Sequence, residues 1–199
     1  MEVMTFVVLE GFSGTGKTSL ARGLERMGWV RLEESAHAVP RDIPVADRAD
    51  TAADYSLMGA TMVYSSIISR QRVGRNVVSE GYLISDLAYA KIRLELKKSM
   101  AYPSMLEMAR TILKEPSLRP DLYVQLKASP ATIAARQTGK DDREKNLTEF
   151  FRTRYYSALE EIHAELGEDR IEEVVTDTNV DATLRLVLEA LGRRSGILA

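Results

Sequence analysis

The sequence predicts a three-layer α/β/α fold built around a five-stranded parallel sheet. Short apolar runs alternate with amphipathic helical segments, which is typical of a parallel sheet with helices on both faces. A run that is apolar throughout, such as residues 5–9, is expected of a strand buried on both faces. A glycine-rich segment follows this run, at the edge where such sheets bind their ligands.

Five short runs rich in apolar and β-branched residues predict the strands. These runs lie at residues 5–9, 29–32, 76–79, 122–126 and 171–176. Helical segments separate them, and this order favours parallel pairing of the strands.

Helical periodicity predicts the segments between the strands. In the first helix, Leu20, Leu24 and Met27 share one face, and Gly28 ends the helix. Residues 35–50 contain two prolines and many polar residues and are expected to form a loop. The helices expected before the fourth strand span residues 18–27, 51–72, 83–98 and 104–114.

Helices are also expected after the fourth strand. Ser129 suits the N-cap of a helix that begins at Pro130. A mixed-charge stretch at residues 140–145 then interrupts the helical pattern and suggests a lid over about residues 137–147. The next helix carries one apolar stripe, made of Phe151, Tyr155, Ala158, Leu159, Ile162 and Leu166. The last helix carries another, made of Leu184, Val187, Leu188 and Leu191, and a short tail is expected after Gly192.

Composition limits the classes of function. The chain has 199 residues, which suits a single domain over residues 1–199 with one sizeable core. Its net charge of -2 gives no general attraction to nucleic acid or to acidic lipid. The absence of cysteine excludes disulfides and thiolate chemistry. Neither a signal-peptide pattern nor an apolar run of membrane length occurs, so we expect a soluble, cytoplasmic protein with no nucleic-acid or membrane partner.

The strongest motif is the glycine-rich segment, which matches the Walker A pattern G-x-x-x-x-G-K-[ST] completely. Glycines let backbone N–H groups surround phosphates, and the following helix directs its positive dipole end at them. Lys17 is expected to contact the β and γ phosphates, and the Thr18 hydroxyl to bind Mg²⁺. A chance glycine-rich turn would not need the flanking strand and helix. The residues expected to bind ATP are Gly11, Ser13, Gly14, Thr15, Gly16, Lys17, Thr18 and Ser19.

Two carboxylates follow predicted strands and are expected at the same edge as the phosphate loop. Glu34 follows the second strand and Glu80 follows the third. A carboxylate there can accept a proton from an attacking hydroxyl or help to hold a metal ion. Acids are common in solvated loops, but two of them at the ends of parallel strands favour a functional role.

Basic residues around the expected lid form the third candidate group. Arg136 and Arg143 are expected to stabilise the charge of a phosphoryl group in transfer, while the role of Lys140 stays open. A solvated charge run is the ordinary alternative. Arg70 and Arg72, near the end of the long helix, are further candidates for an acceptor anion, although cations are also favoured at helix C-termini.

These features together resemble the P-loop nucleoside and nucleotide kinases, specifically the thymidylate and deoxynucleoside kinases. The similarity covers the segment 8–18, the segment 79–91 after the third strand, and the segment 120–136. It implies a P-loop NTPase fold, ATP and Mg²⁺ as cofactors, and a nucleoside or nucleoside monophosphate as the acceptor. It also implies Glu80 as a metal and acceptor residue, Glu34 as the general base, and a homodimer as a possible assembly.

One position departs from the resemblance. The family carries an arginine after the acid of the third strand, whereas this chain has Gly81. A phosphate on the acceptor therefore lacks an expected partner, and a kinase of another small-molecule hydroxyl stays open. A nucleotide-dependent switch or ATPase is the competitor from another class, although no clear apolar strand ending in aspartate supports it.

Overall fold

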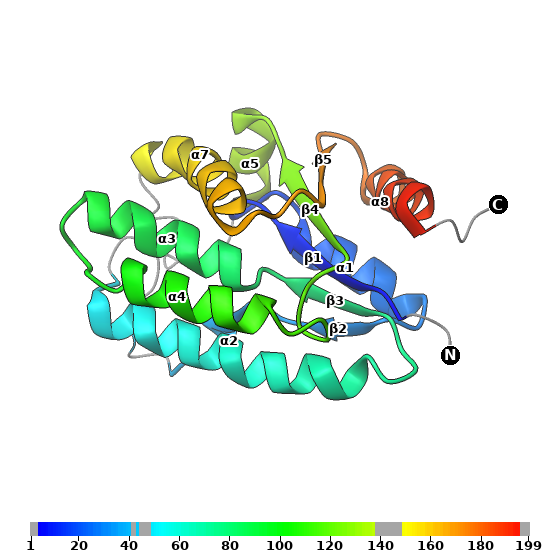
Figure 1. The fold of residues 1–199 in the computed structure, drawn as a ribbon. Helices are drawn as coiled ribbons and strands as arrows, with labels where there is room; N and C mark the ends of the chain where they lie inside the picture. The colour runs from blue at the N-terminus through cyan, green and yellow to red at the C-terminus, as the bar shows by residue number, and fades with distance from the viewer. Residues whose placement is uncertain (1–3, 41–42, 44–48, 138–148, 196–199) are drawn as a thin grey trace.

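The computed structural model describes residues 4–40, 43, 49–137 and 149–195, which form the predicted three-layer α/β/α fold (Figure 1). The strands within these residues are β1 (Phe6–Glu10), β2 (Val30–Leu32), β3 (Val77–Glu80), β4 (Leu122–Lys127) and β5 (Ile171–Val175). All of their pairings are parallel, and their order across the sheet is β2-β3-β1-β4-β5.

β1 is the central strand, and its position determines where the site forms. All five of its residues are buried, as expected of a strand covered on both faces. Its carboxyl end lies between the ends of two neighbours, because Leu9 pairs with Glu80 of β3 and with Val124 of β4. The loop after β1 therefore emerges beside the polar end of β3.

The helices are α1 (Lys17–Arg26), α2 (Thr51–Gln71), α3 (Leu83–Glu95), α4 (Tyr102–Leu113), α5 (Pro130–Gln137), α7 (Glu149–Leu166) and α8 (Val180–Ser195), with a short 3₁₀ turn η1 (Ser35–His37). Figure 1 shows α1 and α8 on one face of the sheet, and α2, α3, α4 and α7 on the other. Alternate side chains of β1 point into these two layers. Phe6 and Val8 pack with the four-helix layer, and Val7 and Leu9 pack with α1 and α8.

Several element ends differ from the sequence prediction for local reasons. α4 begins at Tyr102, earlier than expected, because Pro103 is tolerated in the first turn of a helix. α3 ends at Glu95 because Lys97 has a left-handed φ of 56°, and the N–H group of Lys98 turns back to the carbonyl of Arg93. The expected tail after Gly192 is wrong, since α8 continues to Ser195.

Candidate active site

The phosphate loop joins β1 to α1. Gly11 has a φ of 151°, and a Cβ atom there would lie 2.8 Å from the carbonyl oxygen of Leu126 and 2.6 Å from the Thr15 hydroxyl. Only glycine avoids this contact. The loop is closed internally, because the Thr15 hydroxyl donates to the carbonyl of Phe12 over 2.8 Å. The backbone curve that the motif predicts is therefore present.

The N-terminus of α1 carries the features of an anion site. Its N-cap, Gly16, makes no side-chain cap, and the first turn contains no acidic residue. The positive end of the helix dipole therefore meets no carboxylate from α1 itself. It borders a cavity of about 400 Å³. The lining residues are Ser13, Gly14, Thr15, Gly16, Lys17, Thr18, Ser19, Leu20, Glu34, His37, Arg136, Thr176, Val180 and Thr183.

Lys17 and Glu34 face each other across this cavity. The Lys17 ammonium donates to the carbonyl of Gly11 over 2.7 Å and lies 3.9 Å from a carboxylate oxygen of Glu34. Glu34 remains 35% exposed at its side chain. The structure therefore brings the candidate base to the phosphate-binding lysine.

Glu80 is buried beside Thr18, as expected from its place at the end of β3. The Thr18 hydroxyl donates to one carboxylate oxygen over 2.5 Å, and Arg31 of β2 donates to the other over 2.6 Å. Burial alone would lower the pKa of Arg31, yet its hydrogen bond and its charge pairing with Glu80 raise that pKa overall. Arg31 was not predicted. A charged residue inside a three-residue strand is the signal that could have identified it.

The Thr18 and Glu80 oxygens suit Mg²⁺. They are hard donors, and Mg²⁺ in phosphate sites is held by one or two protein oxygens together with phosphate oxygens and water. Over the described ranges, no group of three or more histidine, aspartate or glutamate side chains could hold a metal ion. The donor set therefore fits a metal shared with a nucleotide, and not one enclosed by protein.

Arg136, in the last turn of α5, closes another wall of the cavity. It donates to the carbonyls of Gly14 and Thr15 over 3.4 and 3.3 Å, and to the Thr176 hydroxyl over 3.1 Å. It therefore connects α5, the phosphate loop and the segment after β5. The expected lid lies outside the described residues from position 138 to position 147, and Arg143 and Lys140 lie outside them too.

A second carboxylate, Asp86 in the first turn of α3, lies near Glu34. It accepts hydrogen bonds from the Ser35 hydroxyl over 3.1 Å and from the Thr61 hydroxyl over 2.5 Å. Burial raises the pKa of Asp86 to about 7, and the charge of Glu34 adds to this shift. The same two causes raise the pKa of Tyr89. No role was predicted for Asp86, because its partners are 51 and 25 residues away.

Gly81 has a backbone reason for its identity. Its φ is 78°, a left-handed conformation that favours glycine, and its N–H group donates to the carbonyl of Leu9 over 2.9 Å. An arginine at this position would strain the turn after β3.

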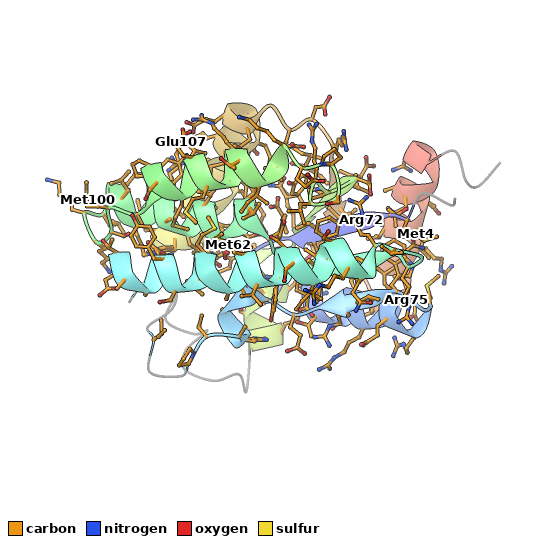
Figure 2. The ribbon with its side chains drawn as sticks, turned by 60° about the horizontal axis from the view of Figure 1, so that its bottom comes forward. Met4, Met62, Arg72, Arg75, Met100 and Glu107 are labelled. Atoms are coloured by element: carbon orange, nitrogen blue, oxygen red, sulfur yellow. The ribbon has the colours of Figure 1, made fainter. Side chains whose placement is uncertain are left out.

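Arg72 does not supply the missing cation. It donates to the carbonyl of Met4 and to the carboxylate of Asp121, at the opposite edge of the sheet from the phosphate loop. Figure 2 shows Arg72 beside Met4, at the end of the long helix. Arg70 lies exposed in the same last turn of α2. Arg72 is therefore engaged away from the phosphate loop, so the expectation of a contact with an acceptor anion is wrong for Arg72, and for Arg70 it stays a prediction.

A buried polar pair lies directly behind the phosphate loop. Glu10, the last residue of β1, is 2.8 Å from the ring of His163 on α7, and both side chains are at most 2% exposed. The ring of Tyr123 packs edge-on against His163. The sequence offered no signal for this pair beyond a carboxylate at the end of a buried strand.

None of the helices in the described part of the chain has both the length and the apolar character needed to cross a bilayer.

Comparisons with known proteins give matches at the level of structure. No protein-family model and no curated protein sequence matches the chain. The thymidylate kinase of Candida albicans superposes with a TM-score of 0.71, at 17% identity, over 96% of this chain and 92% of that one. Deoxyadenosine kinase from M. mycoides with bound dATP superposes with a TM-score of 0.69, at 16% identity, over 94% and 100%.

A third match is the NadR protein in complex with NAD and AMP-PNP, with a TM-score of 0.68 and 19% identity. It covers 98% of this chain and 50% of NadR. The P-loop, the parallel sheet and these matches agree with the resemblance that the sequence suggests. The chain has the three-layer fold of the P-loop nucleoside and nucleotide kinases.

Proposed function

We propose that this protein is an ATP-dependent phosphotransferase that moves the γ-phosphoryl group to a hydroxyl of a nucleoside or a nucleoside monophosphate. One observation carries the proposal. A single cavity is lined by the phosphate loop, by Lys17 and by the half-buried carboxylate of Glu34. A nucleotide-dependent switch would not need a carboxylate facing its phosphate lysine, whereas transfer to a hydroxyl does.

Each residue has a chemical task in this proposal. The loop N–H groups and Lys17 bind the β and γ phosphates. Thr18 and Glu80 hold Mg²⁺, which neutralises phosphate charge when bound. Arg136 and Arg143 stabilise the transferring group, which for Arg136 requires exchange of its carbonyl partners for phosphate oxygens.

The reaction forms one P–O bond, breaks another, and moves one proton. The acceptor hydroxyl oxygen attacks the γ phosphorus, the bond from that phosphorus to the β–γ bridging oxygen breaks, and ADP leaves. Glu34 accepts the hydroxyl proton. Lys17 must then turn from Glu34 to the phosphates, which frees the carboxylate for the acceptor.

Gly81 and Glu34 favour an acceptor without its own phosphate. Two like charges about 6 Å apart repel by about 3 kcal/mol at an effective dielectric constant near 20. The Glu34 carboxylate, which lines the cavity, would therefore oppose a phosphate monoester. The same feature supports the second candidate, a kinase of another neutral or cationic small-molecule hydroxyl.

Replacing Lys17 tests the donor half of the proposal. Lys17→Ala is expected to lower acceptor-stimulated ADP formation by at least about 10³-fold, because the charge on the β and γ phosphates is lost. Nucleosides, their monophosphates and simple alcohols are the acceptors to screen. Lys114→Ala, at the exposed C-cap of α4, is the matched control. Full activity of Lys17→Ala, or turnover that no acceptor stimulates in the unmodified protein, would contradict the proposal.

A further inference from the structure

Three elements meet at the carboxylate of Asp86. Ser35 of η1 and Thr61 of α2 each donate a hydroxyl to it, and Asp86 itself lies in the first turn of α3. Ser35 directly follows Glu34 in the chain. The hydrogen bond from Ser35 therefore connects the residue next to the candidate base with the helical layer of the molecule.

The backbone at Glu34 forms the start of a short turn. Glu34 is the N-cap of η1, and its carbonyl accepts the N–H group of His37 over 2.8 Å. That bond defines the short turn but does not attach it to the rest of the molecule. Ser35 supplies a side-chain attachment to α3, because its hydroxyl donates to Asp86, 51 residues away.

Lys17 cannot serve as the anchor of Glu34 during the reaction. The ion pair between them spans 3.9 Å. In the proposed function Lys17 turns to the phosphates, so a Glu34 held by Lys17 alone would lose its position when the nucleotide binds. The Asp86–Ser35 contact does not involve the phosphate site and persists through that change.

Burying a carboxyl group at position 86 has a desolvation cost that hydrogen bonds to Ser35 and Thr61 do not by themselves require. Burial and the charge of Glu34 disfavour the ionised form, while Thr61, Ser35 and Arg93 favour it. An amide would satisfy both hydroxyls without a charge. The two carboxyl oxygens of Asp86 each accept one hydroxyl, Oδ1 from Ser35 and Oδ2 from Thr61, which suits an anchor shared by three elements.

We infer that Asp86 is a positioning residue, which holds Glu34 toward Lys17 and the transferring phosphoryl group through the hydroxyl of Ser35. This inference rests on the proposed function. It differs from direct acceptor recognition by Asp86, which would change the acceptor KM and not kcat.

A double-mutant cycle tests the link. Ser35→Ala and Asp86→Ala are each expected to lower kcat about 10–100-fold, with the KM for ATP unchanged. The double variant is expected to lose no more than the larger single loss, because both substitutions break the same connection. Asp86→Asn should recover most of the kcat, since its amide still bonds to both hydroxyls. Ser56→Ala, whose hydroxyl bonds only within α2, is the control.

A second measurement works without turnover. The chain contains no cysteine, so Glu34→Cys provides a single attachment point for a spin label. The label is expected to become more mobile in the Ser35→Ala and Asp86→Ala backgrounds, and to stay unchanged with Ser56→Ala.

The outcomes separate the two proposals. Any of three results would overturn the positioning role. The kcat losses of the two single variants could multiply in the double variant, or the acceptor KM could rise at constant kcat. The third such result is a label mobility that does not change in the Asp86→Ala background. Absence of acceptor-stimulated turnover in the unmodified protein refutes the phosphotransferase instead, and the label experiment still decides whether Asp86 positions residue 34.

Discussion

Asp86 connects the chemistry of a single residue with the stability of the protein. Its carboxyl group has a pKa of about 7, against an ordinary value of 3.8, mainly because of burial. The folded protein thus holds this proton more tightly than the unfolded chain does. It follows that the contribution of Asp86 to the free energy of unfolding falls as pH rises from about 4 to about 7.

Asp86→Asn removes this pH dependence, which gives a prediction at the residue scale. We expect its free energy of unfolding, relative to that of the unmodified protein, to increase by about 1–3 kcal/mol between pH 5 and pH 8. Glu34, Tyr89 and Arg93 face the same group and stay unchanged in the comparison. Denaturant unfolding at the two pH values measures the effect, and a constant difference would contradict it.

Residues in the site were predictable where a local pattern requires them. The phosphate loop shows this. Its glycines allow the backbone to curve around phosphates, Lys17 supplies a positive charge, and the motif contains both at fixed spacing. Glu34 and Glu80 could be placed from the rule that parallel strands end at one edge. The contacts of Arg31 and Asp86 could not, since their partners lie 49 and 51 residues away, although a charge inside the short strand β2 hints that Arg31 has a buried partner.

At the scale of elements, α2 and α3 are joined by a buried ion pair. Arg93 and Asp54 are at most 1% exposed at their side chains, and the guanidinium also lies over the ring of Tyr89. A buried pair is costly to form, but it is far more costly to break on one side. The pair therefore fixes how α2 and α3 pack together.

Asp54→Ala is expected to destabilise the protein by about 3–5 kcal/mol, because Arg93 stays buried without that carboxylate. The double variant Asp54→Leu/Arg93→Met should recover most of this loss, since apolar groups of similar volume replace both charges. Denaturant unfolding provides the comparison, with Asp181→Ala, at an exposed position in the first turn of α8, as the control. Equal losses for Asp54→Ala and Asp181→Ala would refute the prediction.

The existence and type of the elements followed from periodicity, while their ends depended on contacts. The apolar stripe of α7 is buried as expected, from Phe151 to Ile162. α3 ends before the left-handed backbone of Lys97. Glycine or asparagine at that position would have predicted this conformation, but lysine does not. Tertiary packing also carried α8 past Gly192, a residue with a low intrinsic preference for helix.

At the scale of the whole molecule, the strand order places every part of the site. With β1 at the centre, the phosphate loop lies between the ends of β3 and β4, and Glu80 and Arg136 reach it from either side. Alternation of strands and helices predicted the layers of this fold. It did not give the order of the strands, which long-range packing decides.

The pair formed by Glu10 and His163 has a consequence for how the molecule opens. Glu10 is fully buried at the end of the central strand, and His163, in the second half of α7, contacts it. If α7 detached alone, it would leave a buried carboxylate without its partner, at a cost of roughly 1–3 kcal/mol beyond the lost packing. The helix and the strand should therefore open together.

Amide hydrogen exchange under native conditions would detect this cooperativity. The amides of β1 and of the second half of α7 are expected to share one opening free energy, and His163→Leu should lower that of α7 alone. α8, which packs on the other face, serves as the reference. Independent exchange of α7 and β1 in the unmodified protein would contradict it. If β1 and α7 do share one opening free energy, the strand that presents the phosphate loop opens together with the helix that begins at Glu149.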